Sequence, residues 1–131
     1  FLNKRKALKR TVLYSCTSSY PANTDDIKLL DILRLKEKYG KLLKAIGFSG
    51  HHRGLSIDNA AIPLGANWFE RHFTFDRTAK GTDHAASLEA EGLRKLRGRL
   101  DETNQTLNYK PNQILKNEKF QRNYLKKIVR I

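Results

Sequence analysis

The chain alternates between short apolar runs and longer segments with helical spacing. Three apolar runs have the length and the β-branched or aromatic content of strands. They cover residues 11–17, 45–49 and 67–73. The segment after each run places apolar residues three or four positions apart, as amphipathic helices do. These segments cover residues 26–40, 55–64 and 88–107. The sequence therefore predicts a unit of strand, loop and helix that occurs three times.

Strands that alternate with helices favour a parallel sheet with right-handed crossovers. The predicted strands are short and almost entirely apolar, which indicates that both faces of the sheet are covered. A further helix is predicted after Pro111, because proline suits a first helical turn and apolar residues follow at helical spacing. Residues 1–10 are expected to be the end of a helix, with basic side chains in its last turn. The predicted fold class is α/β, with three parallel strands alternating with helices plus a C-terminal helix.

Polar side chains stand at the end of each predicted strand, in pairs whose members are two residues apart. The pairs are Ser18 with Tyr20, Ser49 with His51, and Glu70 with His72. Because side chains two apart on a strand share a face, each unit brings its pair to one side of the sheet at the same level. In a closed (β/α) barrel this level is the catalytic face.

Two histidines from adjacent strands, His51 and His72, are suitable ligands for a divalent metal that keeps open positions for substrate, and carboxylates are near. The competing interpretation is a pair of ordinary buried or solvated histidines. His52 points to the opposite side from His51, so we expect it on the surface. His84 completes the four histidines of the chain, and four cannot all be ligands.

Glu70 shares a face with His72 and is a candidate for positioning a substrate or orienting water. The alternative is an ion pair between Glu70 and either Arg53 or Arg71.

Three further residues at the ends of the predicted strands or in the loops after them are Tyr20, Asp83 and Cys16. Tyr20 precedes Pro21 and offers an aromatic hydroxyl in a restricted loop, or else a plug over the rim of the barrel. Asp83 follows Gly81, which frees the backbone to bring a carboxylate close to a ligand. Cys16 has no base beside it in the sequence and is predicted to be a small core residue.

Charge and cysteine content restrict the partners. The formal net charge is +13, but residues 1–10 hold five basic and no acidic side chains, and residues 107–131 hold seven basic and one acidic. A nucleic-acid surface more often runs along the folded body, so we expect no nucleic-acid partner. The alternative is a binding module whose basic ends hold nucleic acid or an acidic partner.

One cysteine excludes an internal disulfide and fits a reducing compartment. No apolar run approaches the roughly 18 residues that cross a membrane. We therefore expect a cytoplasmic location and no membrane partner.

Four motifs, in order and in spacing, resemble the catalytic barrel of the N-acetylneuraminate (sialic acid) synthase family. They are CTSSYP (16–21), GFSGHHRG (47–54), PLGANWFERHF (63–73) and KGTDHAASL (80–88). The resemblance extends from about Thr11 to Lys119 and implies the last three βα units of a (β/α)8 TIM barrel. Residues 1–106 are then the C-terminal portion of the barrel, and residues 107–131 a barrel-closing helix and a linker toward a missing C-terminal domain. Since the chain starts at Phe1 and has no methionine, we expect it to be a piece of a longer protein.

The resemblance also implies an activity. Members of the family join phosphoenolpyruvate to N-acetylmannosamine or a related N-acetylated amino sugar. They use a divalent cation, commonly manganese, with magnesium or cobalt as alternatives. His51 and His72 look like the metal ligands, Ser49 looks like a contact to phosphoenolpyruvate, and Glu70 resembles an active-site carboxylate beside the metal. The positions that resemble the family's sugar-binding residues are Ser18, Tyr20 and Asp83. Asp83 and Glu70 are the expected catalytic residues, and Ser18 stands where many relatives have asparagine.

A related synthase that acts on the precursor of legionaminic acid, pseudaminic acid or a spore-coat sugar acid is the alternative on the same scaffold. The parent protein is expected to be a homodimer. Three of the eight barrel units cannot close a barrel, so we expect the chain alone to be inactive and poorly stable. Its two unpaired sheet edges are expected to promote association.

Overall fold

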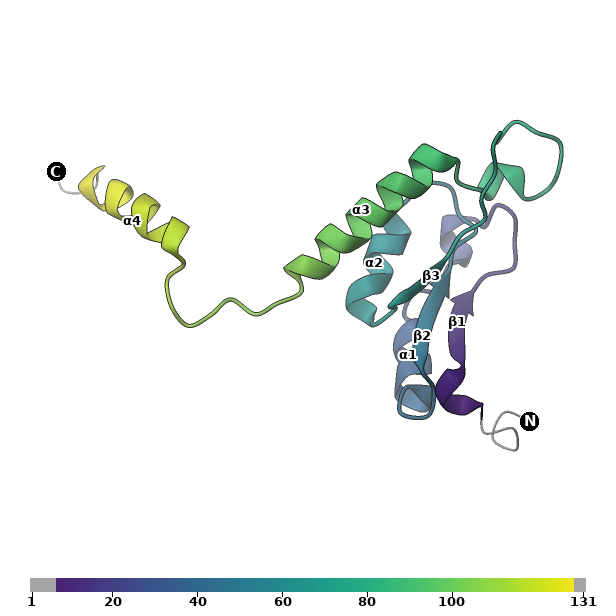
Figure 1. Ribbon diagram of the computed structural model, residues 1–131, viewed down its shortest axis with the longest axis horizontal. Helices are drawn as coiled ribbons and strands as arrows, with labels where there is room; N and C mark the ends of the chain where they lie inside the picture. The colour runs from purple at the N-terminus through teal and green to yellow at the C-terminus, as the bar shows by residue number, and fades with distance from the viewer. Residues whose placement is uncertain (1–6, 129–131) are drawn as a thin grey trace.

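The computed structural model describes residues 7–128, which fold around a three-stranded parallel sheet (Figure 1). The sheet order follows the chain: β1 (Val12–Cys16), β2 (Ala45–Ser49) and β3 (Trp68–Glu70). The helices are α1 (Asp31–Tyr39), α2 (Ser56–Leu64), α3 (Ala90–Thr106) and α4 (Lys116–Ile128). Three short 3-10 turns are η1 (Leu8–Arg10), η2 (Thr24–Asp26) and η3 (His84–Ala86). The predicted alternation of parallel strands and helices is confirmed.

The three strands are in register at their carboxyl ends. Ser49 of β2 pairs with Cys16 of β1 on one side and with Glu70 of β3 on the other. The loops that follow the strands therefore start from one level, and Figure 1 shows them together in the upper part of the view. This shared edge is the place where the sequence predicts the functional side chains.

The hydrophobic core lies between β2 and the helices. Ile46 and Phe48 of β2 are 4% and 2% exposed and belong to one cluster with Ile32 of α1 and Ala61 of α2. Since neighbouring strand residues point to opposite faces, Ser49 points away from this cluster. The helices thus cover one face of β2 and leave the other for the site.

Coverage of the sheet differs between the central strand and the two edge strands. All five residues of β2 are buried, as predicted, but β1 is mostly half-buried and Trp68 of β3 is 42% exposed. The prediction that both faces of every strand are covered is therefore wrong for β1 and β3. Each of these strands has a hydrogen-bonding edge that no other described strand occupies.

Two glycines are required by their surroundings. A Cβ on Gly47 would lie 2.6 Å from Cδ1 of Tyr14 and 2.8 Å from the carbonyl oxygen of Trp68, so the Tyr14 ring and the backbone of β3 can approach this closely only because residue 47 is glycine. Gly65 ends α2 with a φ of 108°, the left-handed conformation that favours glycine at a helix C-terminus.

Several element boundaries differ from those predicted. β3 covers three residues rather than 67–73, and beyond it Phe73 forms an isolated bridge with Leu88. The helix expected from residue 26 begins at Asp31, because residues 24–26 form η2. Of the helix end expected over residues 1–10, residues 8–10 form η1, and residues 1–6 lie outside the described part.

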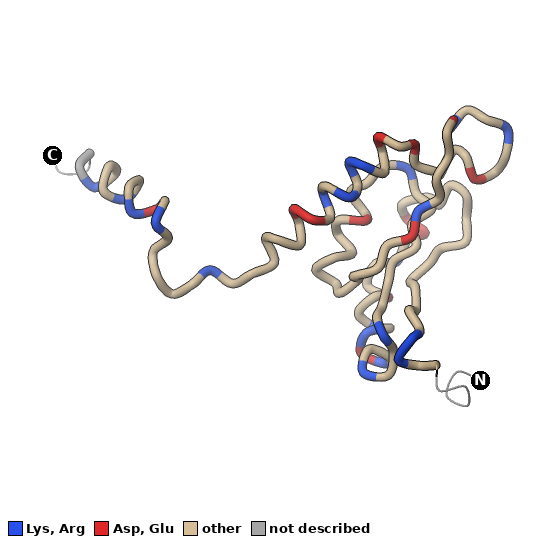
Figure 2. Tube along the Cα trace, viewed as in Figure 1, with Lys and Arg blue, Asp and Glu red and all other residues tan. Residues whose placement is uncertain are grey.

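The last helix, α4, follows an extended segment and stands apart from the sheet (Figure 1). It begins at Lys116, well after Pro111, so proline does not occupy its first turn as predicted. Figure 2 shows that α4 carries more basic than acidic side chains. None of the helices in residues 7–128 combines the length and apolar character needed to cross a bilayer.

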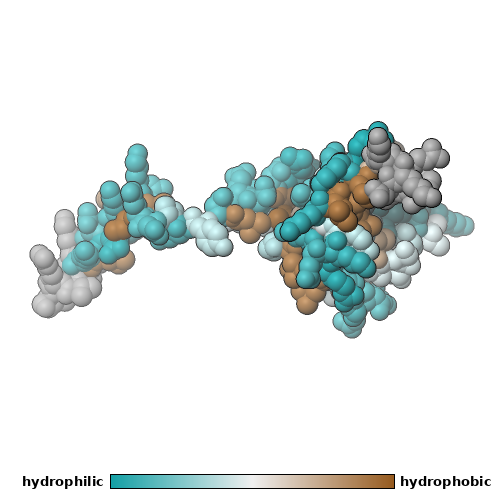
Figure 3. All heavy atoms as spheres, turned by 90° about the horizontal axis from the view of Figure 1, so that it is seen from below, coloured by the Kyte–Doolittle hydropathy of each residue, from teal (hydrophilic) through white to brown (hydrophobic). Residues whose placement is uncertain are grey.

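Large hydrophobic side chains are exposed on both parts of the structure, as Figure 3 shows from below. Leu93 of α3 is 44% exposed, and Phe120 and Tyr124 of α4 are 74% and 59% exposed. Exposed apolar groups that cluster in this way mark surfaces suited to cover by other polypeptide.

The core assignment predicts unequal effects for two phenylalanine substitutions. Phe48→Ala should lower the free energy of unfolding by about 3 to 5 kcal/mol, because it leaves a cavity in the core. Phe75→Ala is the matched control: Phe75 is 93% exposed, so its loss should change stability by less than about 0.5 kcal/mol. Urea denaturation followed by circular dichroism measures both values, and equal losses would contradict the assignment.

Candidate functional site

Two imidazoles meet at the carboxyl edge of the sheet. His51 lies in the loop after β2 and His72 just beyond β3, with ring centroids 5.1 Å apart and planes at 87°. The ring of Tyr20 lies against both, at 4.3 Å from His51 and 5.4 Å from His72. The structure therefore brings together three aromatic side chains that the sequence places in separate units.

The orientation of His51 is fixed by a backbone carbonyl. Its Nδ1 lies 2.8 Å from the carbonyl oxygen of Thr17, and since a carbonyl only accepts, Nδ1–H is the donor. In the neutral ring Nε2 then carries the free lone pair, at 3.4 Å from Oγ of Ser49. His51 is 4% exposed. A histidine held through one nitrogen with the other free is the arrangement of a metal-ligating imidazole.

Ser49 and Glu70 are joined by a direct hydrogen bond. Ser49 Oγ donates to Oε1 of Glu70 at 2.9 Å, as their pairing across β2 and β3 allows. The alternative of an ion pair between Glu70 and Arg53 or Arg71 is wrong for the described side chains, because Arg71 pairs with Asp58 instead. Glu70 thus keeps a carboxylate oxygen free of Ser49 at the site.

Asp83 returns to the site from a long loop. Its Oδ2 lies 3.6 Å from Nδ1 of His72, and its side chain is 52% exposed. The loop reaches this position through Gly81, whose φ is 146°. A hydrogen bond of 2.7 Å between Oγ1 of Thr74 and Nδ1 of His84 holds the residue next to Asp83.

The tip of the same loop is held by a carboxylate turn. Asp76 Oδ1 accepts from Oγ1 of Thr78 at 2.6 Å and from its backbone N–H at 2.7 Å. These two bonds hold the pKa of Asp76 below its ordinary value. The bond from the Thr78 hydroxyl has the larger effect, and the bond from its backbone N–H has the second largest. Arg77 donates to the carbonyl oxygen of Ala85 at 2.8 Å, which closes the loop on itself.

Ser18 and Cys16 lie at the same edge but outside the group of rings. The Ser18 side chain is exposed, and its Oγ is 3.9 Å from Sγ of Cys16. The prediction that Cys16 is a core residue is wrong, because it is exposed at the end of an edge strand.

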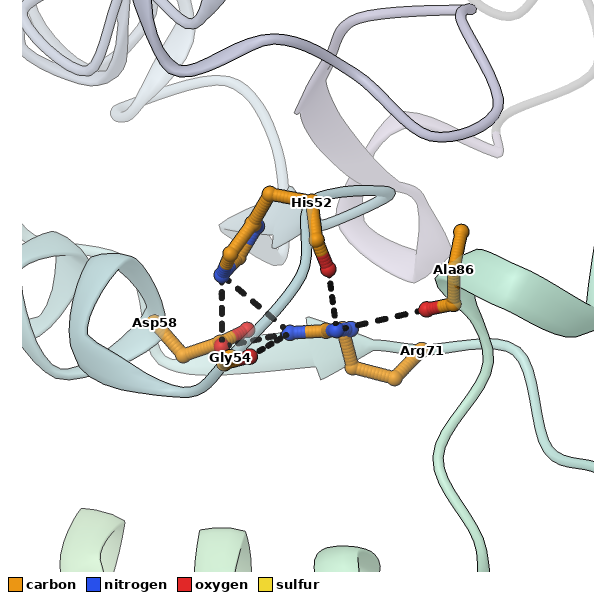
Figure 4. A network of polar contacts seen from close by, with 5 residues as sticks. All are labelled: His52, Gly54, Asp58, Arg71 and Ala86. Carbon is orange, nitrogen blue, oxygen red and sulfur yellow. Dashed lines mark hydrogen bonds and ion pairs between the residues drawn. The ribbon is translucent and has the colours of Figure 1, made fainter. Parts of the chain in front are cut away.

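A buried charged network lies beneath the site (Figure 4). His52 is 1% and Asp58 0% exposed, and the Arg71 side chain is 2% exposed. Asp58 Oδ2 lies 2.6 Å from Nη1 of Arg71 and 3.2 Å from Nε2 of His52. The prediction that His52 is on the surface is therefore wrong, since α2 supplies a buried carboxylate on the side to which His52 points.

Burial lowers the pKa of the Arg71 guanidinium, and the attraction of Asp58 offsets part of this shift. The side chain remains a cation at neutral pH, as arginine does in proteins. Sequence reasoning missed this network, although one signal was present. Asp58 stands one turn before Ala61 on the apolar face of a helix, where a charge requires a partner.

The donor set fits a divalent cation held by two protein ligands. In residues 7–128 no group of three or more histidine, cysteine or acidic side chains is placed to hold a metal ion. Two imidazoles with one oriented free nitrogen nevertheless provide ligands for a first-row transition cation and leave positions for water or substrate. Glu70 and Asp83 lie beside this pair rather than completing a three-ligand group.

The sequence matches the NeuB family over residues 2–112. It is 47% identical over 83 residues to N-acetylneuraminate-9-phosphate synthase of Homo sapiens, an alignment that covers 62% of this chain and 22% of the human protein. It is 42% identical over 94 residues to N,N'-diacetyllegionaminic acid synthase of Campylobacter jejuni, covering 72% of this chain and 27% of that protein. The chain thus spans about a quarter of the length of these relatives.

The fold is similar to that of a solved N-acetylneuraminic acid (sialic acid) synthetase from Leptospira borgpetersenii serovar Hardjo-bovis, in complex with citrate. The TM-score is 0.69 at 33% identity, and the match covers 92% of this chain and 41% of that one. The predicted fold, three βα units of a TIM barrel, is confirmed by this similarity.

The loop geometry predicts a change in the titration of Asp76. Thr78→Val removes the hydroxyl donor but keeps the backbone N–H, so the pKa of Asp76 should rise part of the way to its ordinary value. The stabilisation that Asp76 gives the loop is present above the ordinary carboxyl pKa and lost as pH falls through the lowered one. Carboxyl ¹³C NMR titration measures the shift. Thr24→Val, at an exposed threonine in η2, is the control, and an unchanged Asp76 pKa in Thr78→Val would contradict the prediction.

Proposed function

The chain belongs to the NeuB family, and on that premise we propose that it forms part of the active site of a synthase. The proposed reaction condenses phosphoenolpyruvate with N-acetylmannosamine or a related N-acetylated amino sugar. The observation that carries the proposal is the meeting of His51, His72 and Tyr20 at the carboxyl edge of the sheet. In a (β/α)8 enzyme, this edge is where catalytic groups from different strands converge.

His51 and His72 are the proposed ligands of a divalent cation, with manganese first and magnesium or cobalt as alternatives. When bound, the cation supplies Lewis-acid polarisation of the aldehyde of the open-chain sugar. The bond from His51 Nδ1 to Thr17 orients the ring toward this task, and the Asp83 carboxylate lies 3.6 Å from Nδ1 of His72.

The proposed chemistry forms one carbon–carbon bond and releases phosphate. The enol carbon of phosphoenolpyruvate attacks the aldehyde carbon, water adds to the carbon that carries the phosphate ester, and inorganic phosphate leaves. Glu70 is proposed to orient that water and accept its proton, and the proposal is supported by the fact that Ser49 occupies only Oε1 of its carboxylate. Ser49 lies beside Glu70 on the neighbouring strand and is the proposed contact to phosphoenolpyruvate.

The sugar is proposed to lie over the exposed side of the ring group. Tyr20 is 39% exposed above both imidazoles and presents a ring and a hydroxyl. The half-exposed carboxylate of Asp83 can accept hydrogen bonds from sugar hydroxyls, and its position beside His72 supports its proposed catalytic role. Ser18 offers a further hydroxyl at the end of β1.

A second candidate substrate is the hexose precursor of a legionaminic-type sugar acid. The similarity to the Campylobacter jejuni legionaminic acid synthase favours it, because 72% of the chain takes part in that alignment. Both candidates share the chemistry described above. They differ in the substituents of the sugar, and these substituents would contact the side of the site formed by Ser18 and Tyr20.

The proposed ligands predict a specific loss of metal binding. His51→Ala and His72→Ala should each lose the Mn²⁺ affinity of the chain, because one imidazole alone is a weak site for this ion. His84→Asn is the control: it removes an imidazole but retains a hydrogen-bonding group for Thr74, so Mn²⁺ binding should persist. Titration followed by electron paramagnetic resonance measures free Mn²⁺. Undiminished binding after loss of both ligands would refute the assignment.

The proposed activity predicts phosphate release only from a complete barrel that contains these three units. The chain alone should be inactive, because β1 and β3 each leave an edge open and three strands do not close a barrel around the site. A phosphate assay should show turnover only with phosphoenolpyruvate, amino sugar and divalent cation together. Comparing N-acetylmannosamine, its 6-phosphate and the legionaminic-type hexose identifies the substrate. Full turnover with both His51 and His72 replaced by alanine would overturn the proposed mechanism.

A further inference from the structure

Arg71 stands in the sequence between the two residues that the site uses from the end of β3. Glu70 and His72 flank it in the sequence, yet its own side chain is 2% exposed and directed into the network beneath the site (Figure 4). This position is buried and charged, and none of the roles proposed above includes it.

The Arg71 guanidinium connects the end of β3 to two other backbone segments. It donates to the carbonyl oxygens of His52 at 2.7 Å and Gly54 at 3.1 Å, both in the loop that carries His51. It also lies 3.4 Å from the carbonyl oxygen of Ala86, in the turn that follows Asp83. A single planar group with several fixed donors can satisfy all of these acceptors at once, which a lysine ammonium cannot.

Asp58 supplies the counter-charge from a fourth segment, α2. Its carboxylate is fully buried and lies 2.6 Å from Nη1 of Arg71. Buried ion pairs add little net stability compared with apolar side chains of similar volume, because both ions lose their hydration. Stability alone therefore gives a weak reason for the pair, whereas the fixed geometry of its bonds gives a strong one.

We propose that Arg71 is a positioning residue: with Asp58 as its counter-ion, it sets the relative placement of His51, His72 and Asp83. What this placement is used for rests on the proposed function. The bonds themselves predict a mechanical effect that is measurable without any ligand. Loss of the guanidinium should free the loop after β2 and the turn at 84–86 from the end of β3.

Hydrogen exchange of the chain without added metal tests the mechanical effect. Arg71→Lys keeps the charge opposite Asp58 but loses the fork, so the amides of Gly50 and Ser87 should exchange about tenfold faster or more. Amides of β2 between residues 45 and 48 should retain their protection, because the core is untouched. Arg53→Lys is the matched control, an exposed arginine in the same loop, and should leave all of these rates unchanged.

Mn²⁺ affinity tests what the placement is for. Arg71→Lys should weaken binding by about 10- to 100-fold, the usual effect of losing a group that orients metal ligands. The double variant Arg71→Met with Asp58→Leu removes both charges, so it should recover much of the stability that Arg71→Met alone loses. It should not recover Mn²⁺ affinity, because no donor then reaches the loop carbonyls. This split separates positioning from a merely structural role.

The results distinguish failure of the inference from failure of the proposed function. Unchanged exchange in Arg71→Lys would overturn the inference, as would wild-type Mn²⁺ affinity in the double variant. If the unaltered chain binds no Mn²⁺, the metal assignment fails while the exchange data still judge the positioning role. Local loosening together with weakened binding supports both.

Discussion

The register of the three parallel strands is the constraint on which the site depends. Pairing of Ser49 with Cys16 and with Glu70 makes the strands end at one level, and every loop that carries a candidate residue departs from there. A shift of β3 by one residue would turn Glu70 toward the helices and bring Arg71 to the site face. The apolar cluster around Phe48 fixes which face of β2 is the site face, because it requires the face that carries Phe48 to pack against the helices.

Two layers of polar contacts refine what the register provides. Above the sheet edge, the carbonyl oxygen of Thr17 orients the imidazole of His51, and the Asp83 carboxylate lies near that of His72. Below it, Arg71 and Asp58 form a buried ion pair whose remaining donors bind the neighbouring loops. In the proposed metal site the upper layer presents the ligands and the lower one holds their backbones, so the precision of that site would come from charges that add little to stability.

The sequence was sufficient wherever a local period determined the answer. A period of two along each strand places the pairs ending in Tyr20, His51 and His72 on one side, and these three rings do meet. The alternation of strands and helices likewise indicates a parallel sheet. The four motifs identify the family because their order and spacing are jointly specific, although no single motif is.

The errors arise where the answer depends on distant segments. His52 is buried because α2 places Asp58 beside it and β3 places Arg71 there, and neither neighbour is evident from the loop that contains His52. Cys16 is exposed because no described strand pairs beyond β1, which a local pattern of apolar residues does not reveal. β3 ends at Glu70 because its partner in the ladder, Ser49, is the last residue of β2.

His51 and His72 are proposed to bind one divalent cation, and the decisive measurement is a count of the nitrogens around that cation. Electron spin echo spectroscopy of the Mn²⁺-loaded protein detects the modulation from each coordinated imidazole. We expect modulation from two imidazole nitrogens, and replacing either histidine should abolish it because Mn²⁺ binding is lost. Modulation from a single imidazole, or from none, in the unaltered protein would contradict it.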